Sequence, residues 1–168
     1  MIHVCSLARL HRTVEETRAR HVVTVLKDIS LVNRTAGIQP ENHLHIAVDD
    51  IICPMDGYHH PCEDHVARLL QFVTVWDRAA PIVIHCYAGI SRSTASAFAA
   101  ACALNPRRDE IDIARELRRV SPTAMPNGLI VSLADRILGR GGRMIEAVDA
   151  IGPGDAAYEA DPFRLDLK

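Results

Sequence analysis

Short β-branched runs alternate with segments of helical periodicity along this chain, and the alternation predicts an α/β fold. Strands that alternate with helices form a parallel-dominated central sheet, with the helices packed on its faces. A length of 168 residues suits one domain that can bury a substantial core. We expect this domain to span residues 1–151, and the Gly-, Pro- and Asp-rich residues 152–168 to form a flexible tail.

The first half of the chain contains three predicted strands and two predicted helices. Residues 21–26 are rich in valine, which favours a buried strand. Residues 63–78 repeat apolar side chains at helical spacing, so they form an amphipathic helix with one buried face. The other elements predicted here are a strand at 2–5, a helix from Leu7 to Arg20, a loop at 33–42, a strand at 43–48 and a polar loop at 49–61.

The second half begins with an apolar strand at 82–85, followed by an Ala-rich helix at 94–103. The remainder is predicted to be helical. Asp109 stands where a helix N-cap is expected, and the prolines at 122 and 126 separate two helices. These further helices are predicted at 109–120, 127–138 and 143–150.

Composition argues against several classes of protein. A net charge of −2 gives no case for binding nucleic acid or an anionic membrane. The sequence has no run of about eighteen apolar residues that could span a bilayer, and its first residues lack the pattern of a signal peptide. Five cysteines, an odd number, favour a reducing compartment. We therefore expect a cytoplasmic protein whose partners include neither nucleic acid nor a membrane.

The strongest functional signal is the run from His85 to Thr94, which reads HCYAGISRST. A cysteine ends an apolar strand and the next loop leads into a helix, so backbone N–H groups converge and attract an anion. The same field favours the thiolate form of Cys86. Arg92 can bind two phosphate oxygens with its planar guanidinium. The alternative is a buried cysteine beside a glycine turn, with a surface arginine.

This run resembles the signature H-C-x5-R-[ST] of the cysteine-dependent protein tyrosine phosphatases, most of all the dual-specificity branch and its small bacterial relatives. The resemblance extends from the first strand to about Leu138. It implies a hydrolase in which Cys86 is the nucleophile, Arg92 stabilises the transferring phosphoryl group and Ser93 eases departure of the thiolate. It also implies that His85 supports the loop and that neither a cofactor nor a metal takes part. The residues implied to bind the phosphate are Tyr87, Ala88, Gly89, Ile90, Ser91 and Arg92.

The leaving group needs a general acid, which the resembled family supplies from an aspartate on a loop after the preceding strand. Asp49 and Asp50 follow the third predicted strand, whereas Asp56 and Asp64 better fit the expected distance from the cysteine. Alignment of that strand favours Asp50, with Asp56 next. Asp77 is set aside because it lies within a predicted helix.

Two further features have more than one interpretation. Asn127 resembles an asparagine that supports the phosphate loop in the family, but it also stands where a helix cap is expected. The loop after the third strand is rich in residues of metal-ligand type, with a spacing that matches no zinc pattern, so we expect a polar loop without a metal. A further alternative is that a cysteine of this loop forms a reversible disulfide with Cys86. The residues concerned are Cys53, His59, His60, Cys62 and His65.

Three functions compete. The leading one is hydrolysis of phosphotyrosine in phosphorylated proteins, with phosphoserine and phosphothreonine as further substrates, through a phosphocysteine intermediate. The alternatives are a sulfurtransferase and a non-catalytic module that binds phosphopeptides. Tyr87, Ala88 and Ile90 occupy positions that are basic in phosphoinositide-phosphatase relatives, which argues against highly charged substrates.

Overall fold

A five-stranded sheet forms the centre of the computed structural model, which describes residues 1–33 and 35–167. The strand order is β3-β2-β4-β1-β5, so β4 lies in the middle. The first four strands run parallel, whereas β5 pairs antiparallel with β1, and the predicted parallel-dominated α/β fold is therefore confirmed. The strands are β1 (Ile2–Ser6), β2 (His21–Val25), β3 (His43–Ile46), β4 (Ile82–Cys86) and β5 (Phe163–Leu165).

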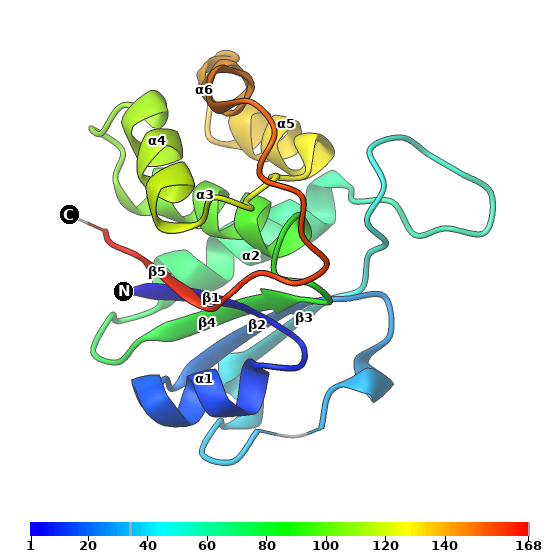
Figure 1. Ribbon diagram of the computed structural model, residues 1–168, viewed down its shortest axis with the longest axis vertical. Helices are drawn as coiled ribbons and strands as arrows, with labels where there is room; N and C mark the ends of the chain where they lie inside the picture. The colour runs from blue at the N-terminus through cyan, green and yellow to red at the C-terminus, as the bar shows by residue number, and fades with distance from the viewer. Residues whose placement is uncertain (34, 168) are drawn as a thin grey trace.

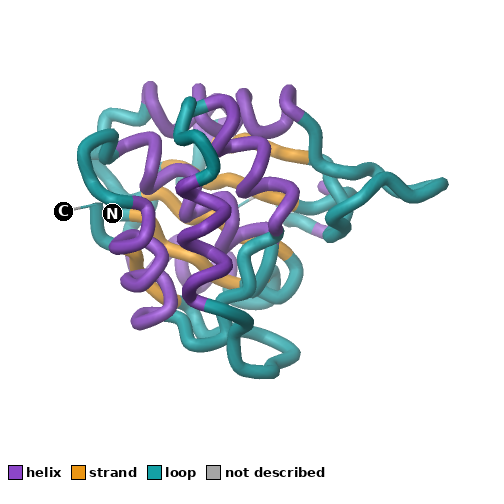
Figure 2. The backbone as a smooth tube through the Cα atoms, turned by 90° about the horizontal axis from the view of Figure 1, so that it is seen from above, coloured by secondary structure: helices purple, strands orange, loops and turns teal. Residues whose placement is uncertain are grey.

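Helices cover both faces of this sheet (Figure 1). Helix α1 lies on one face, and the other helices form a thick layer on the opposite face. The helices are α1 (Leu10–Thr17), α2 (Glu63–Val75), α3 (Arg92–Leu104), α4 (Glu110–Val120), α5 (Gly128–Ile137) and α6 (Arg143–Ile151), with short 3₁₀ turns at Ile29–Leu31 and Pro40–Asn42. The loop 49–61 stands out from the body of the molecule in both views (Figures 1 and 2).

Side chains alternate across the central strand, and this alternation separates two apolar cores. Ile82, Ile84 and Cys86 of β4 face the larger core, beneath the thick helical layer. Val83 faces the smaller core beneath α1. His85 therefore lies on the face opposite Cys86, although the two residues are adjacent in sequence.

Helix α3 is buried almost all round, which explains its alanine-rich sequence. It packs on the sheet and is also contacted by α2, α4 and α5. Small side chains let the helix approach its neighbours closely, and Phe98 fills the space that they leave. The helix starts at Arg92, two residues earlier than predicted, so its N-terminus lies directly beside the cysteine loop.

Several elements end earlier than the sequence predicts. Helix α1 stops at Thr17 instead of Arg20 because Arg18 adopts a left-handed conformation and its N–H closes the last turn. Helix α2 stops at Val75, short of Asp77, because Trp76 leaves the helix and its indole N–H donates to the carbonyl of Ala80. Strand β3 ends at Ile46 rather than at residue 48.

Two other expectations differ from the structure. Asp109 occupies the N-cap position of α4, but its side chain makes no capping hydrogen bond. The sequence predicts a flexible tail at 152–168, whereas residues 163–165 of this segment form β5, in which Phe163 pairs with Val4 and Leu165 pairs with Ile2. Both partners from β5 are buried, so the apolar side chains of the last residues draw the segment onto the sheet edge. Within residues 1–33 and 35–167, no helix is both long and apolar enough to cross a membrane.

A buried ion pair joins the helices of the thick layer. Arg140 donates to Glu110 at 2.9 Å and also to the carbonyls of Cys102 and Pro106. Arg143 binds the second oxygen of Glu110 at 3.0 Å. Only 5% of the Glu110 side chain and 10% of the Arg140 side chain are exposed. The pair therefore fixes α4 against the turn between α5 and α6.

We expect Glu110→Gln to lower the free energy of unfolding by about 3 kcal/mol, because Arg140 would lose its charged partner inside the protein. Urea unfolding at pH 7 measures the change. Burial raises the pKa of Glu110, but the hydrogen bond and charge of Arg143 and the charge of Arg140 outweigh it, and the pKa lies below its usual value. This stabilisation is present above the unfolded pKa and is lost as the pH falls through the folded pKa.

The difference between wild type and Glu110→Gln should therefore shrink in acid. Glu16→Gln is the matched control, because Glu16 forms an exposed pair with Arg12. Its effect should stay below about 1 kcal/mol. A loss at Glu110 no larger than that at Glu16 would show that the buried pair does not stabilise the helical layer.

Candidate active site

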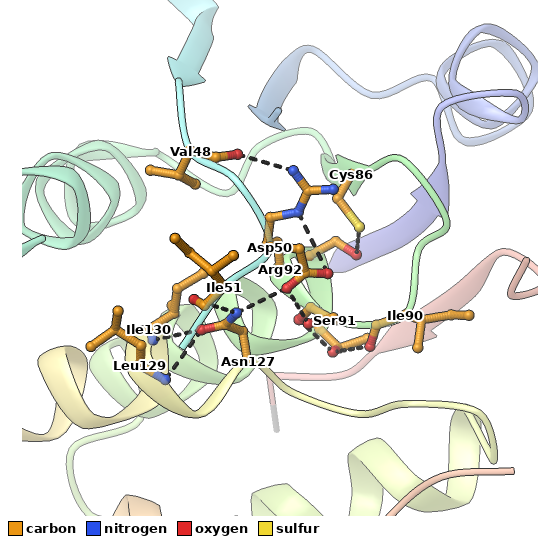
Figure 3. A network of polar contacts seen from close by, with 12 residues as sticks. Val48, Asp50, Ile51, Cys86, Ile90, Ser91, Arg92, Asn127, Leu129 and Ile130 are labelled. Atoms are coloured by element: carbon orange, nitrogen blue, oxygen red, sulfur yellow. Dashed lines mark hydrogen bonds and ion pairs between the residues drawn. The ribbon is translucent and has the colours of Figure 1, made fainter. Parts of the chain in front are cut away.

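The cysteine of the signature run is the last residue of the central strand. Cys86 ends β4, and α3 begins six residues later at Arg92. The carboxyl ends of parallel strands are where ligands bind in open α/β sheets. The sulfur of Cys86 lies 3.1 Å from the hydroxyl oxygen of Ser93, in the first turn of α3 (Figure 3). The predicted nucleophile, Cys86, is thus in contact with Ser93, the residue predicted to ease departure of the thiolate.

Four backbone carbonyls of the loop that joins β4 to α3 point outward. They accept hydrogen bonds from backbone N–H groups of three other segments. These contacts come from the β1–α1 turn, the C-terminal segment and two residues of the loop before α5. The pairs are Leu7 N to Tyr87 O at 3.1 Å, Ala160 N to Ala88 O at 2.9 Å, Met125 N to Ile90 O at 3.0 Å and Asn127 N to Ser91 O at 3.3 Å.

The N–H groups of this loop are left to face the other way. None of the backbone N–H groups of residues 87–91 donates a hydrogen bond to another residue in the described part of the chain. Gly89 has a φ of +77°, and a Cβ there would lie 2.9 Å from the backbone carbon of Cys5. Only glycine suits both the conformation and the close approach. The loop therefore directs its N–H groups and the N-terminus of α3 toward one point, an arrangement that binds anions.

Arg92 is buried beside this point. One terminal nitrogen, Nη1, donates to the carbonyl of Val48 at 3.0 Å. That carbonyl is available because β3 ends two residues earlier. Nε is buried, has no hydrogen-bond partner among the described residues, and lies 3.7 Å from Oδ2 of Asp50. The hydrogen bond from Nη1 to Val48 thus orients the guanidinium, and the edge that carries Nε remains able to donate to an oxyanion.

Asp50 is tied directly to the loop. Its Oδ1 accepts hydrogen bonds from the Ser91 hydroxyl at 2.7 Å and from the Asn127 amide at 2.9 Å. The same amide also reaches the carbonyl of Ile51 at 3.3 Å. Because Oδ1 already accepts two hydrogen bonds, Oδ2 is the oxygen that remains to carry or release a proton. Figure 3 shows Asp50, Arg92 and Cys86 gathered in one place.

Asn127 fulfils both interpretations that its sequence position allowed. Its side-chain oxygen accepts from the N–H groups of Leu129 and Ile130, each at 3.1 Å, and so caps α5. Its side-chain nitrogen donates to Asp50. One residue therefore links the helical layer to the acidic side of the site.

The other candidate acids point elsewhere. Asp49 accepts from the N–H of His59 at 2.8 Å and lies 3.2 Å from Lys27, and it closes the base of the loop 49–61. The hydrogen bond from His59 holds the pKa of Asp49 below its usual value, and Lys27 adds to the effect. Asp56 is exposed in the turn at 55–58, and Asp64 is exposed in the first turn of α2. Among these carboxylates, Asp50 alone contacts the cysteine loop.

His85 directly precedes Cys86, and its side chain lies on the face of the sheet that α1 covers. Its Nε2 is 2.7 Å from the Thr24 hydroxyl, which is also 2.7 Å from Nε2 of His43. Burial lowers the pKa of His85 to about 4. The imidazole is therefore neutral near pH 7, and a supporting role of this uncharged group for the loop stays a prediction.

The cysteine- and histidine-rich loop does not gather into a ligand set. Among the described residues, no group of three or more His, Cys, Asp or Glu side chains could hold a metal. Cys62 instead caps α2, with its sulfur 3.1 Å from Nδ1 of His65. Cys53 is exposed. The disulfide considered for Cys53 or Cys62 with Cys86 stays a prediction.

Sequence reasoning missed the groups that shape the site through their backbone. The carbonyl of Val48 and the N–H groups of Leu7, Met125 and Ala160 contribute no side chain, so no motif marks them. Thr24 could have been suspected, because a buried hydroxyl in an apolar strand needs a polar partner.

Comparison with known proteins places this geometry in context. Residues 11–124 match the family model described as protein-tyrosine phosphatase. No curated protein matches the sequence. The crystal structure of DUSP15 is 15% identical, with a TM-score of 0.66 over 92% of this chain and 94% of its own. The PTP-2 phosphatase of Cydia pomonella is 18% identical, with a TM-score of 0.63 over 80% and 84%. Human DUSP28 is 16% identical, with a TM-score of 0.63 over 83% and 88%. At these identities the likeness shows the fold.

We expect Gly89→Ala to weaken orthovanadate binding by at least about tenfold, because a Cβ would collide with the backbone of β1 and turn the loop amides away. Isothermal titration calorimetry measures the change. Gly141→Ala is the control, since Gly141 shares a positive φ of +62° but has open space around its Cβ position. Equal losses in the two variants would show that backbone strain, and not the loop geometry, controls anion binding.

Proposed function

The chain belongs to the protein-tyrosine phosphatase family, and on that premise we propose that it hydrolyses phosphate monoesters in phosphorylated proteins through a phosphocysteine intermediate. Phosphotyrosine is the leading substrate, with phosphoserine and phosphothreonine as further ones. The observation that carries the proposal is the loop between Cys86 and Arg92, whose carbonyls are held outward. A ring of inward N–H groups suits the three oxygens of a transferring phosphoryl group.

In the first step, the Cys86 thiolate attacks phosphorus and an S–P bond forms as the bond to the leaving oxygen breaks. Arg92 and the loop amides stabilise the negative charge of the equatorial oxygens. Asp50, protonated on Oδ2, gives its proton to the leaving oxygen. Oδ2 of Asp50 lies 3.7 Å from Nε of Arg92. This proximity supports the role of Asp50 as the acid, because it places Oδ2 beside a group that binds the phosphoryl oxygens.

In the second step, water attacks phosphorus, Asp50 takes its proton, and the S–P bond breaks to return the thiolate and inorganic phosphate. The sulfur that departs is stabilised by the Ser93 hydroxyl, which lies 3.1 Å away. The nucleophile, the groups that stabilise the phosphoryl oxygens, the general acid and the hydroxyl that stabilises the departing thiolate are then all supplied by this chain.

The charges around the loop favour a singly phosphorylated side chain over a polyanion. Tyr87 is 65% exposed at the loop, and its neighbour Ala88 carries no charge. Two nearby cations are paired: Arg9 with Glu159 and Lys27 with Asp49. A substrate with several phosphates would find little free positive charge here.

The alternatives predict different chemistry. A sulfurtransferase would form a persulfide from thiosulfate, and a phosphopeptide-binding module would bind without turnover. The buried arginine and the hydroxyl beside the thiol fit phosphoryl transfer better than either of these. Release of phosphate from a phosphotyrosine peptide, assayed beside incubation with thiosulfate, separates the three functions.

Cys86→Ser should reduce hydrolysis of p-nitrophenyl phosphate by about four orders of magnitude, because the hydroxyl is a far weaker nucleophile. Binding of a phosphotyrosine peptide should persist, since the loop amides and Arg92 remain. Steady-state kinetics and fluorescence anisotropy measure the two quantities. Activity within tenfold of wild type would refute the assignment of Cys86 as the nucleophile.

Arg92→Lys should lower kcat about 10²- to 10³-fold, because a point charge cannot supply two parallel donors to the transition state. It would also lose the contact that Nη1 makes with Val48. The pre-steady-state burst of p-nitrophenol reports the first chemical step. A lysine variant with normal kcat would place Arg92 outside the reaction.

Asp50→Asn should lower kcat about 10²-fold for aryl phosphates with poor leaving groups, and much less for p-nitrophenyl phosphate, whose phenolate departs with little protonation. A series of substituted phenyl phosphates gives this dependence as a slope against leaving-group pKa. Asp56→Asn is the control, because Asp56 lies in the turn of the protruding loop. A steeper slope for Asp56→Asn than for Asp50→Asn would reverse the assignment.

A further inference from the structure

The C-terminal segment contacts the phosphate-binding loop directly. The N–H of Ala160 donates to the carbonyl of Ala88 at 2.9 Å. The other three carbonyl contacts come from the β1–α1 turn and the loop before α5, whereas this one comes from the segment that precedes β5, the last strand in sequence. Ala160 is buried, so the contact is shielded from water.

A second contact fixes the same segment. Glu159 accepts a hydrogen bond from the Ser6 hydroxyl at 2.6 Å and lies 3.5 Å from Nε of Arg9. Ser6 is fully buried at the end of β1, where it is the register partner of Cys86 in β4. The carboxylate therefore anchors the segment beside the strand end that carries the nucleophile.

The anchor and the loop share one piece of backbone. Gly89 packs so tightly on β1 that a Cβ would lie 2.9 Å from Cys5 and 3.0 Å from the nitrogen of Ser6. Glu159 holds the side chain of that same Ser6, and Ala160, the next residue, holds the carbonyl just before Gly89. A displacement of residues 159 and 160 would release the Ala88 carbonyl and allow its peptide group to rotate.

We infer that Glu159 is a positioning residue for the phosphate-binding loop. Its carboxylate locks the C-terminal segment onto Ser6 and Arg9, so that Ala160 keeps the Ala88 carbonyl outward and the following N–H groups remain directed at the bound oxyanion. The inference rests on the proposed function for its biological meaning, but anion binding by the loop can be measured without turnover.

The test uses the full chain and inorganic phosphate as the probe. Glu159→Ala should weaken phosphate binding about tenfold in calorimetry, because a charge-assisted hydrogen bond is lost. Hydrogen exchange of the Ala160 amide, which donates to the Ala88 carbonyl, should become faster. With p-nitrophenyl phosphate, kcat should fall along with a rise in KM. Glu159→Gln should restore much of the binding, because its amide oxygen still accepts from Ser6.

Asp161→Ala is the matched control, since Asp161 is an exposed carboxylate two residues further along. It should leave phosphate binding and exchange unchanged. If Glu159→Ala does not fold, Ser6→Ala removes the donor of the same hydrogen bond and should give the same loss. Wild-type phosphate affinity in a folded Glu159→Ala, or in Ser6→Ala, would overturn the inference, as would an equal loss in Asp161→Ala. A wild-type protein that binds phosphate but hydrolyses no ester would refute the proposed function alone.

Discussion

The outward orientation of the carbonyls between Cys86 and Arg92 is the constraint on which the rest of the site depends. A five-residue loop with free carbonyls could rotate its peptide groups, and the N–H dipoles would then no longer converge. Three segments prevent this by donating four backbone N–H groups to those carbonyls, and Gly89 permits the approach to β1. The β1–α1 turn, the loop before α5 and the segment before β5 therefore contribute to one electrostatic feature, although most of them supply no catalytic side chain.

The acidic side of the site depends on a different set of contacts. Asn127 caps α5 and at the same time donates to Asp50, so the position of the carboxylate follows the position of the helical layer. The early end of β3 frees the Val48 carbonyl to orient Arg92. Asp49, although adjacent in sequence, is used to close the base of the protruding loop. The two neighbouring aspartates thus contact different parts of the protein, Asp49 the protruding loop and Asp50 the cysteine loop.

The sequence predicted the parts of this molecule that depend on local pattern. The apolar periodicity placed the first four strands and the six helices, and the residue types between His85 and Ser93 identified the loop and its anion chemistry. What it did not predict depends on contacts between distant segments. The C-terminal residues appeared flexible because glycine, proline and aspartate dominate them locally, while the burial of Phe163 and Leu165 against β1 becomes visible only in the folded sheet. Alignment of the third strand favoured Asp50 over Asp56 as the acid, but the partners of each carboxylate, which single-sequence spacing does not contain, are seen only in the structure.

A crystal structure of the protein with orthovanadate tests the central claim most directly. We expect vanadium bonded to the sulfur of Cys86, with its equatorial oxygens within hydrogen-bond distance of the N–H groups of residues 87–92 and of the Nε edge of Arg92. The four outward carbonyl contacts should be unchanged from those described above. An anion bound elsewhere, or a loop whose carbonyls turn inward when vanadate binds, would contradict the claim that the fold holds these N–H groups ready for a phosphoryl group.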